Sequence, residues 1–387
     1  MRPRHINFLT NASASASGLF IPIYASALGA SPEQLGFIVA SYNAFILFSN
    51  LFFGRAADVQ GARKILRLGL LLSAVAALTQ PLAYDSVTLI LSRALLGFCI
   101  GMYPAALLAY AKTADRPMGR FAALGSLGWA MGTLSAGLLS WLAPTVLWPV
   151  FGLSAALYLV AFFLAGAAPT EAAGRFRIPF LPLAVIRRNL TIYVSILIRH
   201  TGANMVWVIF TLYLVDIGHM SGLQVGIVYM LNPLVQFLVM ARTDRIGSGA
   251  LLATGLGLSA VTFVTFTVSA DFVWILGTQV LLGISWATLY TGALRFIAER
   301  NPEIATAGGL LGSVLSISSI LGPIAGGLLS STQADVRASY VVPMYVAAAM
   351  SLGSFVVYLA ARPAAPIRGR APAARSVNSA RGPEGFP

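Results

Sequence analysis

The stretch FGRAADVQGARK, from Phe53 to Lys64, places one acidic residue, three basic residues and two glycines between two long apolar runs. Only 10% of the 387 residues are charged, so this connection concentrates charge that is rare elsewhere in the chain. Short basic connections of this kind are typical of the cytoplasmic ends of transmembrane helices. The flanking apolar runs are therefore the first candidates for membrane-spanning helices.

The composition of the whole chain is that of a membrane protein. Hydrophobic residues make up 58% of the sequence and the mean hydropathy is +0.81, above the values of soluble proteins. Apolar runs of about 20 residues cross a bilayer as helices, because no water is present there to bond an open backbone. Since the runs lack the alternation of a β-barrel, we expect an all-α membrane protein with twelve transmembrane helices. These helices are expected at residues 6–28, 33–53, 65–84, 87–110, 120–142, 146–167, 190–215, 222–240, 250–269, 272–294, 306–330 and 340–361.

Basic residues alternate from one connection to the next. All of the 25 lysines and arginines except Arg93, Arg199 and Arg337 fall in or next to every second connection or near the two ends of the chain. The positive-inside rule then places both termini in the cytoplasm of a multi-pass protein of the cell membrane. Because the net charge of +13 is spread over many short loops, it does not indicate a nucleic-acid-binding face. The opposite connections carry acidic residues, among them Glu33, Asp85, Asp271 and Asp335.

The longest internal connection, residues 168–189, divides the helices six and six and is predicted to be a cytoplasmic linker. It separates a first six-helix bundle at residues 1–167 from a second at residues 190–362. Residues 363–387 are rich in Pro, Ala and Arg and have few apolar side chains to bury. We therefore expect a disordered cytoplasmic tail there.

The two halves of the chain are weakly alike when they are aligned at a shift near 190 residues. The segment SPEQLGFI from Ser31 parallels SGLQVGIV from Ser221. A consistent register across several helix pairs indicates two pseudo-symmetric six-helix bundles, the plan of many secondary transporters with a substrate cavity between the halves. In the fifth and eleventh helices, Gly119, Gly128, Gly132 and Gly137 match Gly309, Ser318, Gly322 and Gly327 at a shift of 190.

The opening stretch resembles a motif of the major facilitator superfamily (MFS), and the resemblance of the chain to that family covers residues 5–362. Val59 stands where the family has a base. The resemblance implies the MFS fold and a secondary transporter, which is not an enzyme. The residues that match the family's loop between its second and third helices are Gly54, Asp58, Gly61, Arg63 and Lys64.

The loop motif predicts a conformational latch at the cytoplasmic end of the second helix. Gly61 would allow a tight turn with positive φ, and Asp58 would accept hydrogen bonds from a helix N-terminus in the opposite bundle, where the helix dipole favours an anion. The other interpretation is a positively charged turn that only orients the chain. The second half repeats these two residues as Asp244 and Gly247 but lacks the closing bases, so we expect an asymmetric latch.

Two weaker patterns resemble other motifs of the family. Arg93, Gly97 and Gly101 resemble a fourth-helix motif in which an intramembrane arginine precedes spaced glycines. The segment GPIAGG from Gly322 resembles a fifth-helix motif of the family's antiporters, but here the fuller copy lies on the eleventh helix. It implies either export or plain close packing of helices. The residues that we expect to pack helices are Gly128, Gly132, Gly322, Pro323 and Gly326.

A charged side chain inside a span costs about 2.5–3.5 kcal/mol on insertion scales, so we expect Arg93 and Arg199 each to have a structural or functional role. We expect Arg199 to line a cavity, and Arg93 to contact either a ligand or backbone carbonyls. His200, Asn204 and Trp207 form a polar and aromatic stripe at helical spacing. Similar stripes on other helices complete a candidate substrate cavity, although such residues also join helices to one another. The candidates are Asn11, Tyr42, Asn43, Arg93, Arg199, His200, Asn204, Trp207, Tyr229, Asn232, Gln236, Gln279, Trp286 and Tyr290.

Several kinds of site are not expected. No Asp or Glu lies deep in an apolar run, so proton coupling would fall to His200, which is the one intramembrane side chain that ordinarily titrates near neutral pH. The single cysteine, Cys99, has no partner, and the three histidines fall at different depths. No phosphate-binding loop is present. We therefore expect no metal, no cofactor and no catalysis.

We predict a secondary active transporter of a small organic solute that works by alternating access, with efflux of drug-like or metabolite molecules as the first expectation. Uptake or facilitated diffusion of an anionic or polar nutrient is the alternative, because two intramembrane arginines have no intramembrane acid. A membrane receptor without transport is a third interpretation, but the tail is too short for a signalling domain. The expected partners are the solute, the lipid bilayer and a proton as the candidate coupling ion, and we expect a monomer.

Overall fold

The protein consists of α-helices and short turns, without strands, in the parts that the structure describes. The structure is a computed structural model, and it describes residues 3–113, 118–143, 147–166, 183–240, 242–243, 246–301 and 304–361. The first half contains α1 (Pro3–Leu19), α2 (Ile21–Ala27), α3 (Pro32–Gln60), α4 (Ala62–Thr79), the 3₁₀ turn η1 (Gln80–Leu82), α5 (Ser86–Gly101), α6 (Pro104–Thr113), α7 (Met118–Leu142) and α8 (Trp148–Ala165). The second half contains α9 (Leu183–Asp216), α10 (Gly222–Met240), α11 (Ser248–Val268), α12 (Phe272–Arg300), α13 (Ile304–Ser331) and α14 (Val336–Ala360).

Each of the twelve predicted spans corresponds to one helix or to two consecutive helical pieces, so the predicted all-α fold with twelve transmembrane helices is confirmed. Within the described ranges, nine segments are long and apolar enough to cross a membrane by length and composition alone. The predicted tail at 363–387 and most of the predicted linker, residues 168–182, lie outside the described residues.

Two of the predicted spans are interrupted by proline. We expected one helix at 6–28, but α1 ends at Leu19 and α2 begins with Pro22 in its first turn. The expected helix at 87–110 is likewise divided where α6 begins at Pro104. Proline lacks the backbone N–H that a helix interior needs, and it fits the first turn of a new helix.

Several helices are longer than their apolar runs. The second predicted span, which is α3 in the structure, continues to Gln60 rather than ending near 53. The seventh, α9, begins at Leu183, inside the predicted linker. Charged residues continue a helix once it leaves the hydrocarbon core, because its backbone still bonds to itself. The turn in the opening stretch is therefore confined to Gly61, whose φ of 95° confirms the positive φ that we predicted there.

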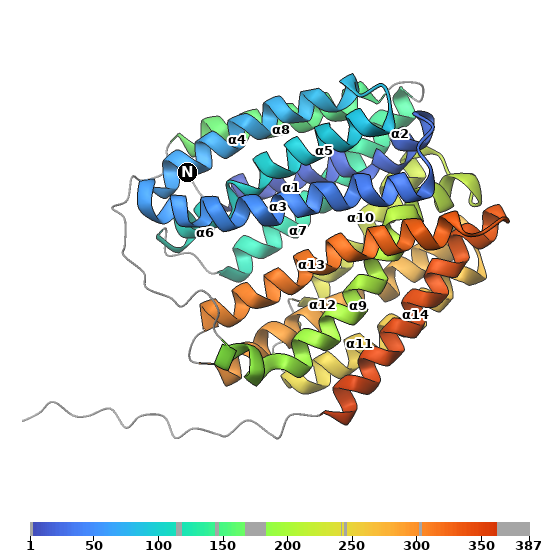
Figure 1. The fold of residues 1–387 in the computed structure, drawn as a ribbon. Helices are drawn as coiled ribbons and strands as arrows, with labels where there is room; N and C mark the ends of the chain where they lie inside the picture. Colours follow the sequence, from blue (N-terminus) through green and yellow to red (C-terminus); the bar gives the residue numbers. More distant parts are fainter. Residues whose placement is uncertain are drawn as a thin grey trace, which may run out of the picture.

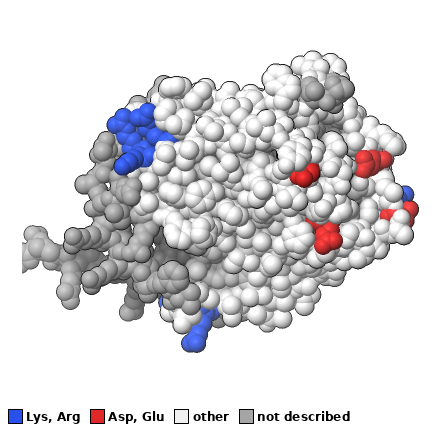
Figure 2. All heavy atoms as spheres, turned by 45° about the horizontal axis from the view of Figure 1, so that its top comes forward, with Lys and Arg blue, Asp and Glu red and all other residues white. Residues whose placement is uncertain are grey.

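Acidic side chains begin helices at one end of the molecule. Asp85 accepts a hydrogen bond from the backbone N–H of Thr88 at 2.7 Å, and Asp335 accepts one from Ala338 at 2.7 Å. A carboxylate is favourable at these positions because the N-terminus of a helix carries partial positive charge. The hydrogen bonds from Thr88 also hold the pKa of Asp85 below its usual value. Figure 2 shows Asp and Glu near this end and most of the visible Lys and Arg at the other, and we name the two ends the acidic end and the basic end.

The helices form two bundles, which Figure 1 shows as a blue-to-green group and a yellow-green-to-red group. In the first bundle α1 packs along α7, α3 along α5 and α4 along α8, and in the second α9 packs along α13 and α14, and α11 along α12. The bundles touch mainly where α3 meets α13 and where α7 meets α10. The internal repeat relates these two contacts to each other, because α3 corresponds to α10 and α7 to α13.

The bundles share one apolar core at the acidic end and have separate cores toward the basic end. The shared core brings Phe20 and Leu35 of the first bundle together with Phe210 and Val225 of the second. The other two cores each contain residues of one bundle alone. The hydroxyl of Thr211 also donates to a backbone carbonyl of α1 at 3.2 Å across the acidic-end junction. The bundles are therefore joined at the acidic end.

Glycines allow this close approach. Gly137 of α7 lies against Gly226 of α10, and a Cβ atom on Gly137 would lie 2.6 Å from the Cα of Gly226. At the repeat-related junction, a Cβ atom on Gly36 of α3 would collide with the carbonyl group of Pro323 on α13. Contacts this close exclude any side chain, so both junctions depend on glycine.

Candidate substrate cavity

A cavity of about 730 Å³ lies between the two bundles. Its walls come from α1, α3, α5 and α7 of the first bundle and from α9, α10, α12 and α13 of the second, with a contribution from α2. Of the fourteen candidate cavity residues, all except Tyr290 line it. They are Asn11, Tyr42, Asn43, Arg93, Arg199, His200, Asn204, Trp207, Tyr229, Asn232, Gln236, Gln279 and Trp286.

The cavity extends from near the basic end to the junction at the acidic end. Its lining includes Asn7, close to the beginning of α1, and Gln236, close to the end of α10, both toward the basic end. At the other limit it reaches Leu19 and Thr211, which are bonded to each other. A solute in this cavity would be separated from the acidic end by the shared apolar core.

Arg199 is buried at the middle of α9, with 2% of its surface exposed. Its Nε donates to the hydroxyl of Ser259 on α11 at 2.8 Å, and that hydroxyl lies 2.7 Å from the hydroxyl of Ser285 on α12. The guanidinium carbon lies 5.1 Å from the ring centre of Trp286 and 5.5 Å from that of Phe263. These partners orient the positive charge and stabilise it through the ring faces.

Besides the guanidinium of Arg199, Trp286 contacts two rings of the second bundle. The imidazole of His200 stacks on its ring at a centroid distance of 4.9 Å and an interplanar angle of 22°. Tyr290 stacks on the same ring system at 5.5 Å and 14°. Tyr290 therefore supports a wall residue without lining the cavity. The Nδ1 atom of His200 is buried, and no described residue forms a hydrogen bond with it.

Arg93 faces the cavity from the first bundle, with 4% of its surface exposed. Its guanidinium carbon lies 3.9 Å from the ring centre of Tyr42, and Gly97 lets α5 approach the backbone of Tyr42 closely. Nε and Nη1 of Arg93 have no hydrogen-bond partner among the described residues. The bonds to backbone carbonyls that we considered for Arg93 are thus not found at these two nitrogens.

Gln279 occupies on α12 the position that the repeat equates with Arg93 on α5. Its side chain is 1% exposed, and in the part of the chain that the structure describes neither its amide nitrogen nor its amide oxygen has a hydrogen-bond partner. An unsatisfied buried amide costs about 1–3 kcal/mol, so a ligand that bonded to it would gain from its presence. Gln279 and Arg93 thus offer unpaired polar atoms to the cavity from opposite bundles.

The polar side chains of α10 that line the cavity are hydrogen-bonded to residues of α9 or to one another. The hydroxyl of Tyr229 lies 2.9 Å from that of Thr211, and Trp207 contacts the Tyr229 ring at a centroid distance of 5.9 Å. The amide of Gln236 donates to the side-chain oxygen of Asn232 at 2.6 Å. The polar side chains of this wall thus have partners within the protein, unlike the atoms of Arg93 and Gln279 described above.

Sequence reasoning missed part of the wall on α1 and α7. Asn7 lies one turn before Asn11, whose amide donates to the Asn7 side-chain oxygen at 3.0 Å, and both line the cavity. Ser126, Trp129 and Thr133 line it from α7. Their spacing of three and four residues is the same helical stripe that identified the other walls, so the signal was present in the sequence.

The predicted latch is described only in part. The surroundings of Gly54, the side chain of Asp58 and all of Asp244 lie outside what the structure describes. Arg63 donates a hydrogen bond to the carbonyl oxygen of Gly166, just after the end of α8, and Lys64 is exposed. The latch therefore stays a prediction, and Arg63 holds the described part of the first loop to the end of α8.

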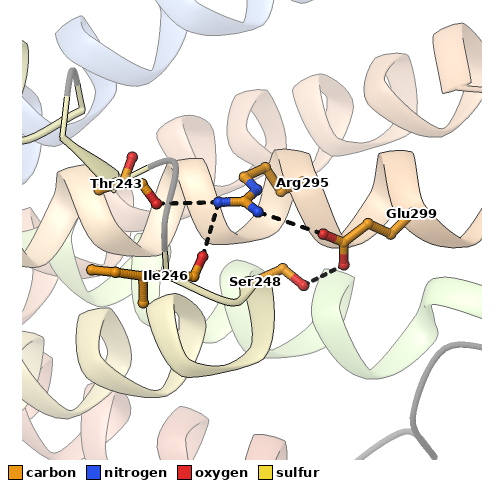
Figure 3. Close-up of polar contacts among 5 residues, drawn as sticks. All are labelled: Thr243, Ile246, Ser248, Arg295 and Glu299. Atoms are coloured by element: carbon orange, nitrogen blue, oxygen red, sulfur yellow. Dashed lines mark hydrogen bonds and ion pairs between the residues drawn. The ribbon is translucent and has the colours of Figure 1, made fainter.

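The corresponding loop of the second half is held by a residue of another helix, as Figure 3 shows. Arg295 of α12 donates to the carbonyl oxygens of Thr243 at 3.1 Å and Ile246 at 2.9 Å. It also pairs with Glu299 at 3.9 Å, and Glu299 accepts a hydrogen bond from Ser248 at 2.6 Å. The second loop lacks closing bases of its own, and Arg295 supplies a base to it.

The glycines predicted to pack helices lie at contacts inside each bundle. A Cβ atom on Gly128 or Gly132 of α7 would collide with the backbone of α1. A Cβ atom on Gly322 or Gly326 of α13 would likewise collide with α9. Pro323 differs, because it lines the cavity and also meets Gly36 across the bundle junction.

Comparison with known sequences supports the architecture. Residues 6–238 and 192–383 match the family model described as Major Facilitator Superfamily. The chain is 27% identical over 367 residues to the multidrug resistance protein MdtG of Citrobacter koseri, which covers 84% of the chain and 86% of that protein. It is 24% identical over 172 residues to the quinolone resistance protein NorA of Staphylococcus aureus, which covers 43% of the chain and 42% of that protein.

Solved structures share the fold at low identity. The nucleoside transporter NupG matches with a TM-score of 0.75 at 13% identity, covering 93% of this chain and 99% of that one. A bacterial homologue of the human lysosomal transporter Spinster, in an inward-facing and unoccupied conformation, matches with a TM-score of 0.72 at 14% identity. It covers 92% of this chain and 96% of that one. At these identities the likeness shows the fold alone.

Proposed function

The chain belongs to the Major Facilitator Superfamily, and on this premise we propose that it exports a small organic solute across the cell membrane by alternating access. The observation that carries the proposal is the cavity of about 730 Å³, whose polar and aromatic walls come from both bundles. The similarity to a multidrug resistance protein over 84% of the chain supports efflux of drug-like or metabolite molecules.

The mechanism follows from where the bundles touch. The positive-inside rule places the basic end, and with it both termini, in the cytoplasm. The described state, joined at the acidic end, would then admit solute from the cytoplasm. Rocking of the bundles would separate the glycine junctions at Gly36 and Gly137 and open the cavity to the outside. Because one chain encloses the cavity, a monomer is sufficient for this cycle.

Coupling to a proton gradient would use His200, because the cavity residues that the structure describes include no aspartate or glutamate. This absence favours a second candidate function, in which the protein allows uptake or facilitated diffusion of an anionic or polar nutrient. A receptor that does not transport is the third candidate.

Counterflow in proteoliposomes distinguishes these candidates. Purified protein is reconstituted, loaded with members of a solute panel, and assayed for exchange with and without an imposed pH gradient. Gradient-driven accumulation on the side facing the acidic end supports coupled export, whereas flux that ignores the gradient identifies facilitated diffusion. The variant Gly137→Leu serves as a transport-deficient comparison. Its larger side chain would obstruct the junction between α7 and α10, so it should lose flux while remaining folded. If no solute moved in any condition, the transport proposal would be wrong.

A further inference from the structure

The charge of Arg199 is oriented but not neutralised. Its Nε donates to the neutral hydroxyl of Ser259, while Nη2 is buried without a hydrogen-bond partner among the described residues. Ser259 in turn lies within hydrogen-bond distance of the backbone carbonyl of Gly255 at 2.8 Å, so the chain of bonds ends at a neutral acceptor. The ring faces of Trp286 and Phe263 give the guanidinium about 0.5–2 kcal/mol, which is less than the penalty for a buried charge.

No acidic residue that the structure describes lies at the depth of Arg199. Among the described residues of α9 and of the second-bundle helices that surround it, acidic side chains lie at helix ends or at N-caps, as with Asp216 and Glu299. The described cavity lining also has no acid, while it contains Arg93 in addition to Arg199. A cationic solute would meet two uncompensated positive charges, and an anionic solute would neutralise at least one of them.

The surroundings of Arg199 suit an organic anion rather than a bare ion. Trp286, next to the guanidinium, and His200, stacked on Trp286, give the cavity an aromatic wall there, and Trp207 lines the cavity farther along α9. Gln279 lies seven residues from Trp286 along α12, about 10 Å at 1.5 Å per residue, and its unpaired amide faces the same cavity. A solute that reached from Arg199 to Gln279 would need an apolar body between its polar ends.

We infer that the solute is an organic anion with an aromatic or other apolar body, whose carboxylate or similar group binds the guanidinium of Arg199 at its unpaired Nη2, beside Trp286. This inference rests on the proposed transport function and names the charge of its substrate. Arg199 presents a forked donor group, which binds a carboxylate with more geometric specificity than a lysine does.

The test compares probes that differ only in charge. Carboxylate, carboxamide and aminomethyl derivatives of benzene, naphthalene and anthracene are titrated by calorimetry into the full-length protein in nanodiscs. We expect at least one carboxylate to bind at least about tenfold more tightly than its carboxamide, and the amines not to bind. Equal affinities, binding of the amines alone, or no binding by any series would each overturn the inference. The comparison uses the unmodified protein and does not depend on whether a variant folds.

Variants then assign the charge preference to Arg199. Arg199→Gln should remove the preference for carboxylate over carboxamide, and Arg199→Lys should keep part of it. Ser259→Ala removes only the group that orients Nε, so it should weaken carboxylate binding severalfold while keeping the preference. Arg242→Gln, at an exposed arginine of the basic end, is the matched control and should bind as the unmodified protein does. An unchanged preference in folded Arg199→Gln would contradict the assignment.

Two further arms separate the possible failures. Saturable binding of chloride or phosphate that is as tight as that of the best carboxylate would identify an inorganic counter-ion and overturn the organic-anion inference. In proteoliposomes, flux of neutral or cationic members with no preference for the anion would preserve the transport proposal and overturn this inference. Anion-selective binding without flux of any solute would preserve this inference about the bound anion and overturn the transport proposal.

Discussion

Gly137 of α7 and Gly226 of α10 lie so close that a Cβ atom on Gly137 would be 2.6 Å from the Cα of its partner. Gly137→Ala should therefore weaken the junction at the acidic end and shift the population toward the state that is open there. Steric overlap of this kind costs about 1–3 kcal/mol, enough to change a two-state ratio severalfold or more. Distances between spin labels at the exposed residues Tyr84 and Val336, in a Cys99→Ala background, measure the shift.

The matched control for this junction is Gly277→Ala. Gly277 lies within α12, and a Cβ atom there would meet no neighbour within 4 Å. Its label distances should be those of the parent protein. Identical distance distributions for Gly137→Ala and Gly277→Ala would show that the glycine junction does not set the conformational equilibrium.

The predicted latch should be asymmetric. Asp58→Asn is expected to lower the initial transport rate about tenfold, and Asp244→Asn to lower it much less, because only the first loop has closing bases of its own. Rates are measured in proteoliposomes with equal amounts of reconstituted protein. Equal losses would count against the latch and favour a role in orientation alone.

Arg295→Gln should destabilise the second bundle at the basic end. Its guanidinium joins two loop carbonyls to α12, and such bonds are worth about 1–3 kcal/mol in total once partial exposure to water is considered. Glu299→Gln should cost less, about 0–1 kcal/mol, because the 3.9 Å ion pair is partly exposed. Thermal unfolding in detergent compares the two variants. If Glu299→Gln lowered the melting temperature more, the loop bonds would not be the main contribution.

Tyr290 should affect binding without touching the solute. Tyr290→Ala removes a ring stacked on Trp286, and the loss of an aromatic contact worth about 0.5–1.5 kcal/mol should weaken binding about two- to tenfold. Tyr290→Phe keeps the ring and should bind as the parent does. Titration of the tightest-binding naphthalene or anthracene probe measures both variants. Loss of affinity in Tyr290→Phe would indicate that the hydroxyl, rather than the stacking, matters.

The sequence predicted the twelve spans because burial in lipid requires long apolar runs, and that requirement can be read locally. It did not predict the breaks near Pro22 and Pro104, since proline also occurs inside helices such as α13, where Pro323 lies. It also placed the end of α3 too early, because hydropathy ends at the first charges while the helix continues to Gln60.

The cavity was largely predictable because its walls follow helical stripes, and thirteen of the fourteen candidates line it. Tyr290 shares a helix face with Trp286, and only the packed structure shows that its ring stacks on that of Trp286 and is not among the residues that line the cavity. The bond from Arg199 to Ser259 and that from Arg295 to the second loop join residues 60 and about 50 positions apart. No local pattern indicates such pairs, so contacts between residues this far apart could not be predicted from the sequence.

The shared apolar core has a consequence for how the protein is made. When the first six helices have entered the bilayer, Gly36 and Gly137 and the carbonyl of Leu19 have no partner until the second half arrives. During synthesis, lipid chains must cover this face and then leave it as α10 and α13 insert. The two halves, although similar in sequence, thus differ in biogenesis. The first inserts with its bundle interface covered by lipid, and the second completes the fold by displacing that lipid.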